Sequence, residues 1–114
     1  MFQDLINGKF TLCVTTDILL EYEEIITRKL GRKVAESVMK VLDNLYNVEY
    51  IIKYFFWELI KADYDDNKFV DCSIACNANY LATNDNHFNV LKDLDFPTIN
   101  IVNLDELTLI LKDI

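Results

Sequence analysis

The chain has 114 residues, of which 52% are hydrophobic, and its formal net charge is −8 at pH 7. This length suits one domain with a sizeable core, and the apolar fraction, with only two glycines and one proline, excludes a disordered or linker-rich chain. The acidic balance argues against a protein that holds nucleic acid on a broadly basic surface. It is compatible with carboxylates crowded around a divalent cation. We therefore expect a single domain over residues 1–114.

No apolar run approaches the roughly 18 residues of a membrane-spanning helix, and the first residues lack the basic and then apolar order of a signal peptide. Cys13, Cys72 and Cys76 are odd in number and show no CxxC spacing. We expect a cytoplasmic protein with reduced thiols and no membrane contact.

The first half of the chain alternates between helix and strand patterns. We expect the end of a helix over residues 1–7, a strand over 10–14, helices from about 17 to 29 and from about 33 to 46, and a strand over 48–52. Thr15-Thr16-Asp17 supplies capping residues for the first long helix. The basic cluster between the two long helices, Arg28, Lys29, Arg32 and Lys33, is a candidate for RNA-phosphate contact or a solvated helix end.

Two glutamates flank the apolar stripe of the helix over residues 17–29. Glu21 lies at one flank and Glu23 at the other, while Glu24 faces away. Periodicity alone does not choose between Glu21 and Glu23. Glu21 lies nearer the helix start and so nearer the carboxyl edge of the strands, where ligands bind in open α/β sheets.

The stretch from residue 62 to 88 places acids at both ends of a buried helix and a short strand. Asp63, Asp65 and Asp66 open the helix, and Asp85 follows the expected strand at 80–83. A helix starts, and the next parallel strand ends, at the same edge of a sheet. We therefore expect Asp66 and Asp85 to be neighbours and to form a cation site. Asp65 and, more weakly, Asp71 are candidates for supporting roles.

The remaining elements are a short helix from about residue 87 to 94, a strand over 99–102 and a helix over 104–112. The alternating order predicts a parallel α/β sandwich. Trp57 and Tyr54 are candidates for stacking on RNA bases, although core packing explains such aromatics more often. His87 is the only histidine, and we do not assign it to the ligand set, because a lone histidine in a first helical turn is more often structural.

The motif D-D-N-K-F-V-D followed by Y-L-A-T-N-D-N-H-F is similar to the C-terminal half of PIN domains, the metal-dependent ribonuclease fold of many bacterial toxins of toxin–antitoxin pairs. The resemblance implies a three-layer α/β/α sandwich with a mostly parallel central sheet. It implies that Asp66 and Asp85 are catalytic metal-site acids and, through L-L-E-Y-E-E, that Glu21 is the site's second acid. The implied cofactor is Mg²⁺ or Mn²⁺, the substrate is RNA, and an antitoxin protein or a second copy are possible partners.

PIN domains resemble one another in starting with a central strand that ends in an aspartate, and this sequence starts at the end of the helix that follows. We therefore expect a truncated chain or a natural variant without its first acid, with self-association through the open sheet. The first functional hypothesis is a metal-dependent endoribonuclease, and the alternative is a catalytically impaired module that binds RNA or a partner protein. A phosphate-receiver domain ranks last, because the acidic pair and the lysine of that class are not found here.

Overall fold

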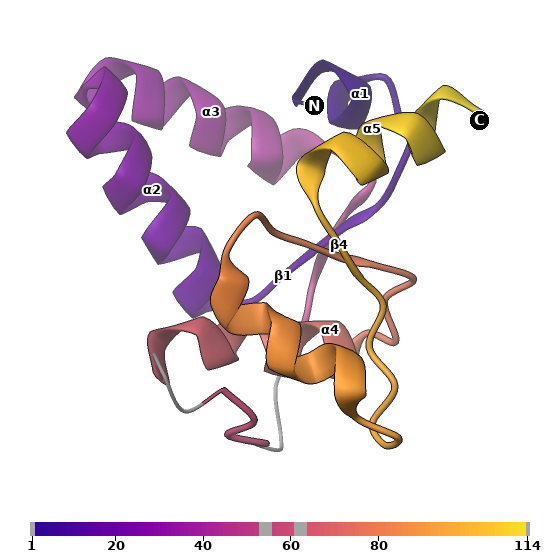
Figure 1. Cartoon of the computed structure of the whole chain (residues 1–114). Helices are drawn as coiled ribbons and strands as arrows, with labels where there is room; N and C mark the ends of the chain where they lie inside the picture. The colour runs from indigo at the N-terminus through magenta and orange to yellow at the C-terminus, as the bar shows by residue number, and fades with distance from the viewer. Residues whose placement is uncertain (1, 53–55, 61–63, 114) are drawn as a thin grey trace.

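The computed structural model describes residues 2–52, 56–60 and 64–113, and Figure 1 shows their course. The elements in chain order are α1 (Phe2–Ile6), β1 (Leu12–Val14), α2 (Thr16–Leu30), α3 (Arg32–Asn44), β2 (Val48–Tyr50), η1 (Tyr64–Asp66), α4 (Asn67–Ala75), β3 (Leu81–Ala82), η2 (Asn86–Asp93), β4 (Ile101–Val102) and α5 (Leu104–Lys112). Elements η1 and η2 are 3₁₀-helices, so the helix expected after Asp85 is present as a 3₁₀-helix, which is wound more tightly than an α-helix.

The strands form two separate parallel pairs, β1 with β2 and β3 with β4. The fold is therefore α/β with parallel strands, as the alternating sequence pattern predicts. Within the described residues no pairing joins the two pairs into one sheet, so the three-layer sandwich around a single central sheet stays a prediction. The strands of the second pair are two residues long, shorter than the apolar runs suggested.

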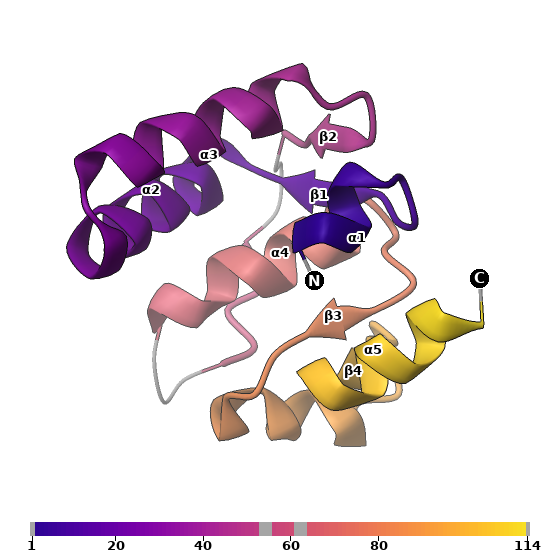
Figure 2. The ribbon, with the colours of Figure 1, turned by 90° about the horizontal axis from the view of Figure 1, so that it is seen from above.

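The inner edges of the two pairs carry main-chain groups that point away from their partner strands. Along a strand, the main-chain groups of successive residues face alternate sides. Leu12 N–H donates to the Asn47 carbonyl, and the Val14 carbonyl accepts from the Ile51 N–H, so the N–H and C=O of Cys13 face away from β2. The same alternation turns Ala82 away from β4. Figure 2 shows β1 and β3 on the inner sides of the two pairs, with α4 passing between them in this view.

Two apolar clusters form the core, and α4 contributes to both. The first gathers around β1, α2 and α3 and includes Val14, Ile18 and Cys72. The second gathers around η2 and includes Val70, Phe88 and Leu91. The ring of Phe69 packs against both clusters. Helix α4 therefore holds the two halves of the described chain together through burial of apolar surface.

Two buried polar side chains of α4 fasten it to the segment that precedes it. The Asn67 side chain donates to the Ile60 carbonyl at 2.8 Å and accepts from the Ile60 N–H at 2.9 Å. One turn later, a carboxylate oxygen of Asp71 accepts from the Trp57 N–H at 3.1 Å. Both side chains are buried, so these bonds satisfy groups that would be costly to leave unpaired. They fix the start of α4, and with it the position of Asp66.

Candidate metal centre

Local hydrogen bonds place Asp85 just after β3. Its main-chain N–H donates to the Thr83 hydroxyl at 3.1 Å, and its own carboxylate accepts from the His87 N–H at 2.9 Å. Asp85 is thus the cap of η2, the role for which aspartate is favoured because it accepts from free main-chain N–H groups. This hydrogen bond fixes the direction in which the His87 side chain leaves the main chain.

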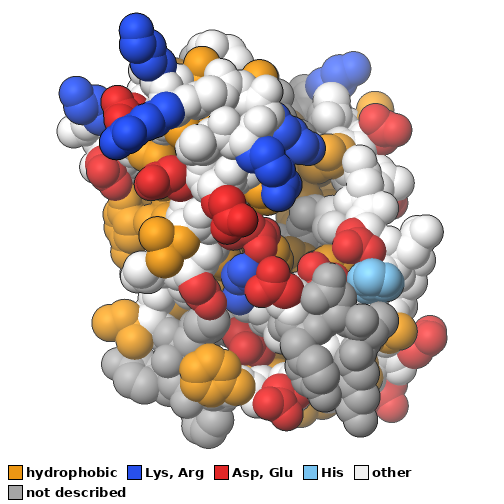
Figure 3. All heavy atoms as spheres, turned by 90° about the vertical axis from the view of Figure 1, so that its left-hand side faces the viewer, with side chains coloured by type: hydrophobic (Ala, Val, Ile, Leu, Met, Phe, Trp, Pro, Cys, Tyr) orange, Lys and Arg blue, Asp and Glu red, His pale blue; other side chains and the backbone are white. Residues whose placement is uncertain are grey.

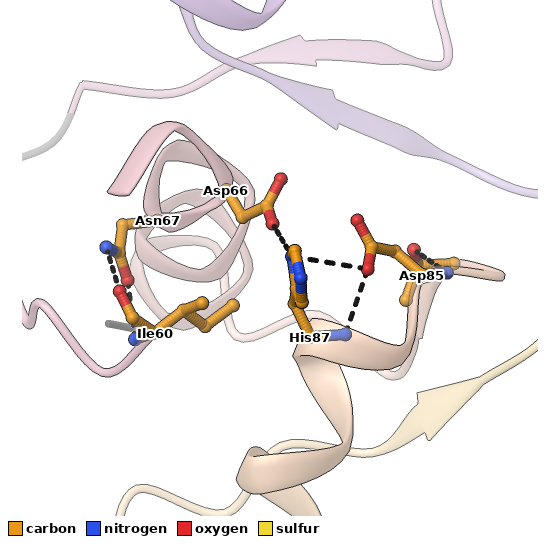
Figure 4. Close-up of polar contacts among 6 residues, drawn as sticks. Ile60, Asp66, Asn67, Asp85 and His87 are labelled. Atoms are coloured by element: carbon orange, nitrogen blue, oxygen red, sulfur yellow. Dashed lines mark hydrogen bonds and ion pairs between the residues drawn. The ribbon is translucent and has the colours of Figure 1, made fainter. Parts of the chain in front are cut away.

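Asp66, Asp85 and His87 meet at one point, shown in Figure 4. The Nδ1 atom of His87 lies 3.3 Å from Oδ2 of Asp66 and 3.5 Å from Oδ1 of Asp85. One ligand-type atom from each residue lies within 4.8 Å of the other two. The topological argument from the sequence therefore correctly makes Asp66 and Asp85 neighbours, although they belong to different elements.

Glu21 lies outside this group and is bound by a lysine. One of its carboxylate oxygens is 2.7 Å from Nζ of Lys68, which also lies 3.2 Å from Asp65. The Lys68 side chain is only 14% exposed and that of Glu21 23%. Desolvation lowers the pKa of Lys68, but the pairing with Glu21 and Asp65 outweighs it, and the net shift is upward. Lys68 follows Asp66 by two residues in the chain, and its ion pair joins Glu21 of α2 to α4.

The structure separates the two glutamates that periodicity left equivalent. Glu23 is exposed and lines a groove of about 620 Å³ between α2 and α3, together with Thr27 and Met39. Glu21 faces α4 instead. The preference for Glu21 over Glu23 as a site acid stays a prediction, because Glu21 pairs with Lys68 and lies outside the group of Asp66, Asp85 and His87.

The other polar residues singled out by the sequence have varied positions. Asp65 pairs with Lys68, and the buried Asp71 accepts from the Trp57 N–H rather than joining the cation group. Trp57 is half-buried and packs edge-on against Phe96, with ring centroids 6.2 Å apart; Phe96 is itself 81% exposed, so this contact lies at the surface and belongs to neither core cluster. Asp63 and Tyr54 lie outside the described residues.

His87 is the functional candidate that sequence reasoning left out. Its lone occurrence suggested a structural histidine, yet it stands beside both acids. The signal that points to His87 is its position two residues after Asp85. A residue at that position donates its main-chain N–H to the capping aspartate, so its side chain leaves the main chain close to the carboxylate. Nothing in the spacing alone shows that the ring turns toward Asp66.

Acidic side chains gather in the middle of the face shown in Figure 3, with the histidine at one side of them. Basic side chains gather at the top of the same view, and Arg28, Lys29, Arg32 and Lys33 are all exposed around the α2–α3 turn. A polyanion that contacts this turn would therefore lie on the same face as the acids.

Carboxylate oxygens and an imidazole nitrogen are donors that divalent cations accept, oxygen being preferred by Mg²⁺ and nitrogen being suited to later first-row metals. Two carboxylates also match the charge of a divalent ion. Asp66, Asp85 and His87 thus fit a divalent cation in donor type and spacing.

A family model described as the PIN domain matches residues 1–87, more than half of the chain. The chain therefore belongs to the PIN domain family, whose members are in general nucleases that depend on divalent metals and bind RNA. Comparisons with curated proteins and with solved structures returned no match. Across the part of the chain that the structure describes, no helix has the length and apolar character needed to cross a membrane.

Proposed function

We propose that this PIN domain is a divalent-metal-dependent endoribonuclease that hydrolyses RNA phosphodiester bonds. The observation that carries the proposal is the convergence of Asp66, Asp85 and His87 from two elements. Asp66 and Asp85 hold the cation directly, and Glu21, which pairs with Lys68 of α4, is the third acid of the site. The cation is Mg²⁺ or Mn²⁺, and when bound it polarises the scissile phosphate and lowers the pKa of an attacking water.

The chain's own residues contribute orientation and charge. The Asn67 and Asp71 bonds hold the start of α4, so that Asp66 faces Asp85 without reorganisation when RNA arrives. The exposed basic turn between α2 and α3 offers phosphate contacts on the same face. Lys68, which is mostly buried in its ion pairs, limits the repulsion among the neighbouring acids.

We also propose that the protein acts as the toxin of a toxin–antitoxin pair, in the cytoplasm. The support is the likeness of its motif to such toxins, together with a net charge of −8, which suits a basic antitoxin. Copurification with the product of an adjacent gene, and loss of RNA cleavage in that complex, would support this role. Cleavage that is unaffected by any such product would count against it.

The test of the nuclease proposal is RNA cleavage with Mg²⁺, with Mn²⁺ and with EDTA, comparing Asp85→Asn with Glu23→Gln. Each variant removes one negative charge, but only Asp85 belongs to the cation group. We expect Asp85→Asn to abolish cleavage and the rise in melting temperature that Mn²⁺ produces by binding the folded state. Glu23→Gln should behave as the unmodified protein. Equal effects of both variants would show that only bulk charge matters.

A second candidate function is a PIN module that binds RNA or a protein without cutting. The ion pair between Glu21 and Lys68 favours it, because this acid is already neutralised and fewer carboxylates are left to hold a cation. Filter binding separates the two functions. RNA that is retained but remains intact with either metal would establish the binding module.

A further inference from the structure

The position of His87 between two carboxylates carries an inference beyond the general metal dependence of the family. The cap formed by Asp85 fixes the His87 main chain, and the ring then turns so that Nδ1 lies 3.3 Å from Asp66 and 3.5 Å from Asp85. Figure 4 shows the ring reaching from η2 toward the start of α4. A cation held by both acids would therefore also meet this nitrogen.

An imidazole nitrogen changes which cation a site prefers. Nitrogen ligands favour Co²⁺, Ni²⁺ and Zn²⁺, and to a smaller degree Mn²⁺, whereas Mg²⁺ is held almost only by oxygen. The two carboxylates already balance a divalent charge, so the third ligand needs no charge of its own. A neutral ring in this place adds affinity for transition metals while adding little for Mg²⁺.

We propose that His87 is a direct nitrogen ligand and that it makes this site prefer a first-row transition cation over Mg²⁺. This inference rests on the proposed function, because it uses the same pair of acids. The opposite arrangement is a protonated His87 that sits between the carboxylates in place of a metal, as an internal cation. The two arrangements predict opposite effects of removing the ring, since an internal cation competes with metal and a ligand assists it.

The first measurement uses the unmodified protein. His87 is the only histidine of the chain, so its ring protons are the only imidazole signals in a proton NMR spectrum. Addition of Co²⁺ should move these signals far outside their usual range, because a paramagnetic ion shifts the protons of a ring that binds it. The shift should disappear in Asp85→Asn. Ring signals that stay in place while Co²⁺ binds would overturn the inference.

The second measurement compares affinities for Co²⁺ and Mg²⁺ by calorimetry in His87→Asp, which turns the donor set into carboxylates only. Because the loss of even an outer-shell partner typically costs about tenfold or more in metal affinity, we expect the ratio of Co²⁺ to Mg²⁺ affinity to fall by at least about tenfold. Asn89→Asp is the matched control, since it adds the same charge at an exposed position of η2. It should leave the ratio unchanged.

The outcomes separate this inference from the proposed function. If Asp85→Asn removes metal binding but His87→Asp leaves the affinity ratio unchanged, the cation site stands and His87 is not its selective ligand. If His87→Ala strengthens metal binding, the ring is an internal cation and the inference is wrong. If Asp85→Asn leaves metal binding intact, the proposed site and the inference fail together. Circular dichroism of each variant shows whether it is folded.

Discussion

The ammonium group of Lys68 lies 2.7 Å from a carboxylate oxygen of Glu21, and this ion pair joins α4 to α2 beside the candidate metal centre. Lys68 also contacts Asp65 at 3.2 Å. Both partners of the Lys68–Glu21 pair are mostly buried, so water weakens their attraction less than it does for a surface pair.

The first prediction concerns the energy of this ion pair. A double-mutant cycle with Lys68→Met and Glu21→Gln should give a coupling of about 1–3 kcal/mol in the free energy of unfolding. The exposed pair of Arg32 and Glu36, 3.3 Å apart, is the matched control and should couple by less than about 0.5 kcal/mol. The fold raises the pKa of Lys68. The coupling between Lys68 and Glu21 should therefore be complete at a pH below the ordinary pKa of lysine, and it should be lost as the pH rises through the raised pKa. Equal couplings for both pairs would contradict the role of burial.

The second prediction concerns the two hydrogen bonds between the Asn67 side chain and the Ile60 main chain. Asn67→Ala removes both bonds and leaves the buried N–H and carbonyl of Ile60 without these partners. We expect a loss of about 2–4 kcal/mol in the free energy of unfolding, because buried main-chain groups lose their hydrogen bonds. Denaturant unfolding measures it. Asn86→Ala, at an exposed position, should lower the free energy of unfolding far less. A similar loss for both variants would show that the Asn67–Ile60 hydrogen bonds do not fix α4.

The third prediction concerns stability in alkali. Burial raises the pKa of Tyr22 from 10.0 to about 12, and the nearby Cys72 and Glu21 act in the same direction. Because the fold raises this pKa, the protonated Tyr22 adds to the free energy of unfolding. Its contribution is complete below pH 10 and is lost as the pH rises toward 12. The loss is on the order of 3 kcal/mol for a shift of this size. Burial likewise raises the pKa of Cys13 to about 12, which adds to the same trend.

Unfolding free energies measured between pH 9 and pH 12 test this prediction. Tyr22→Phe should remove a large part of the alkaline loss, because phenylalanine has no proton to release. The control is Tyr80→Phe, at an exposed tyrosine, which should retain the full loss. A pH profile of Tyr22→Phe identical to that of the unmodified protein would refute the assignment to Tyr22.

The fourth prediction concerns the open edges of β1 and β3. The N–H and C=O of Cys13 and Ala82 point away from their partner strands, and such edges invite pairing with another strand. We expect the molar mass by light scattering to rise with concentration, as for a homodimer. Ala82→Pro removes the outward N–H and should shift the equilibrium toward monomer, whereas Ala82→Ser keeps the N–H and should not. A monomer at every concentration would contradict it.

The sequence alone predicted those parts of the fold that depend on near neighbours. Thr15 is the cap of α2, and its side chain accepts from the Ile18 N–H, because capping is decided within one turn of a helix. The proximity of Asp66 and Asp85 also followed from the sequence, since chain topology brings a helix start and a strand end to one edge.

Only the tertiary structure decided which side chains meet at the candidate site. Lys68 binds Glu21 because α2 and α4 pack together, and the His87 ring faces Asp66 because η2 and the start of α4 lie close. The division of the strands into two pairs is equally a matter of packing. Glu21 and Lys68 are 47 positions apart in the chain and Asp66 and His87 are 21 apart, and contacts at such separations leave no periodic pattern in a sequence. The sequence therefore determined the elements and the edge at which the acids gather, and packing between distant elements determined their partners.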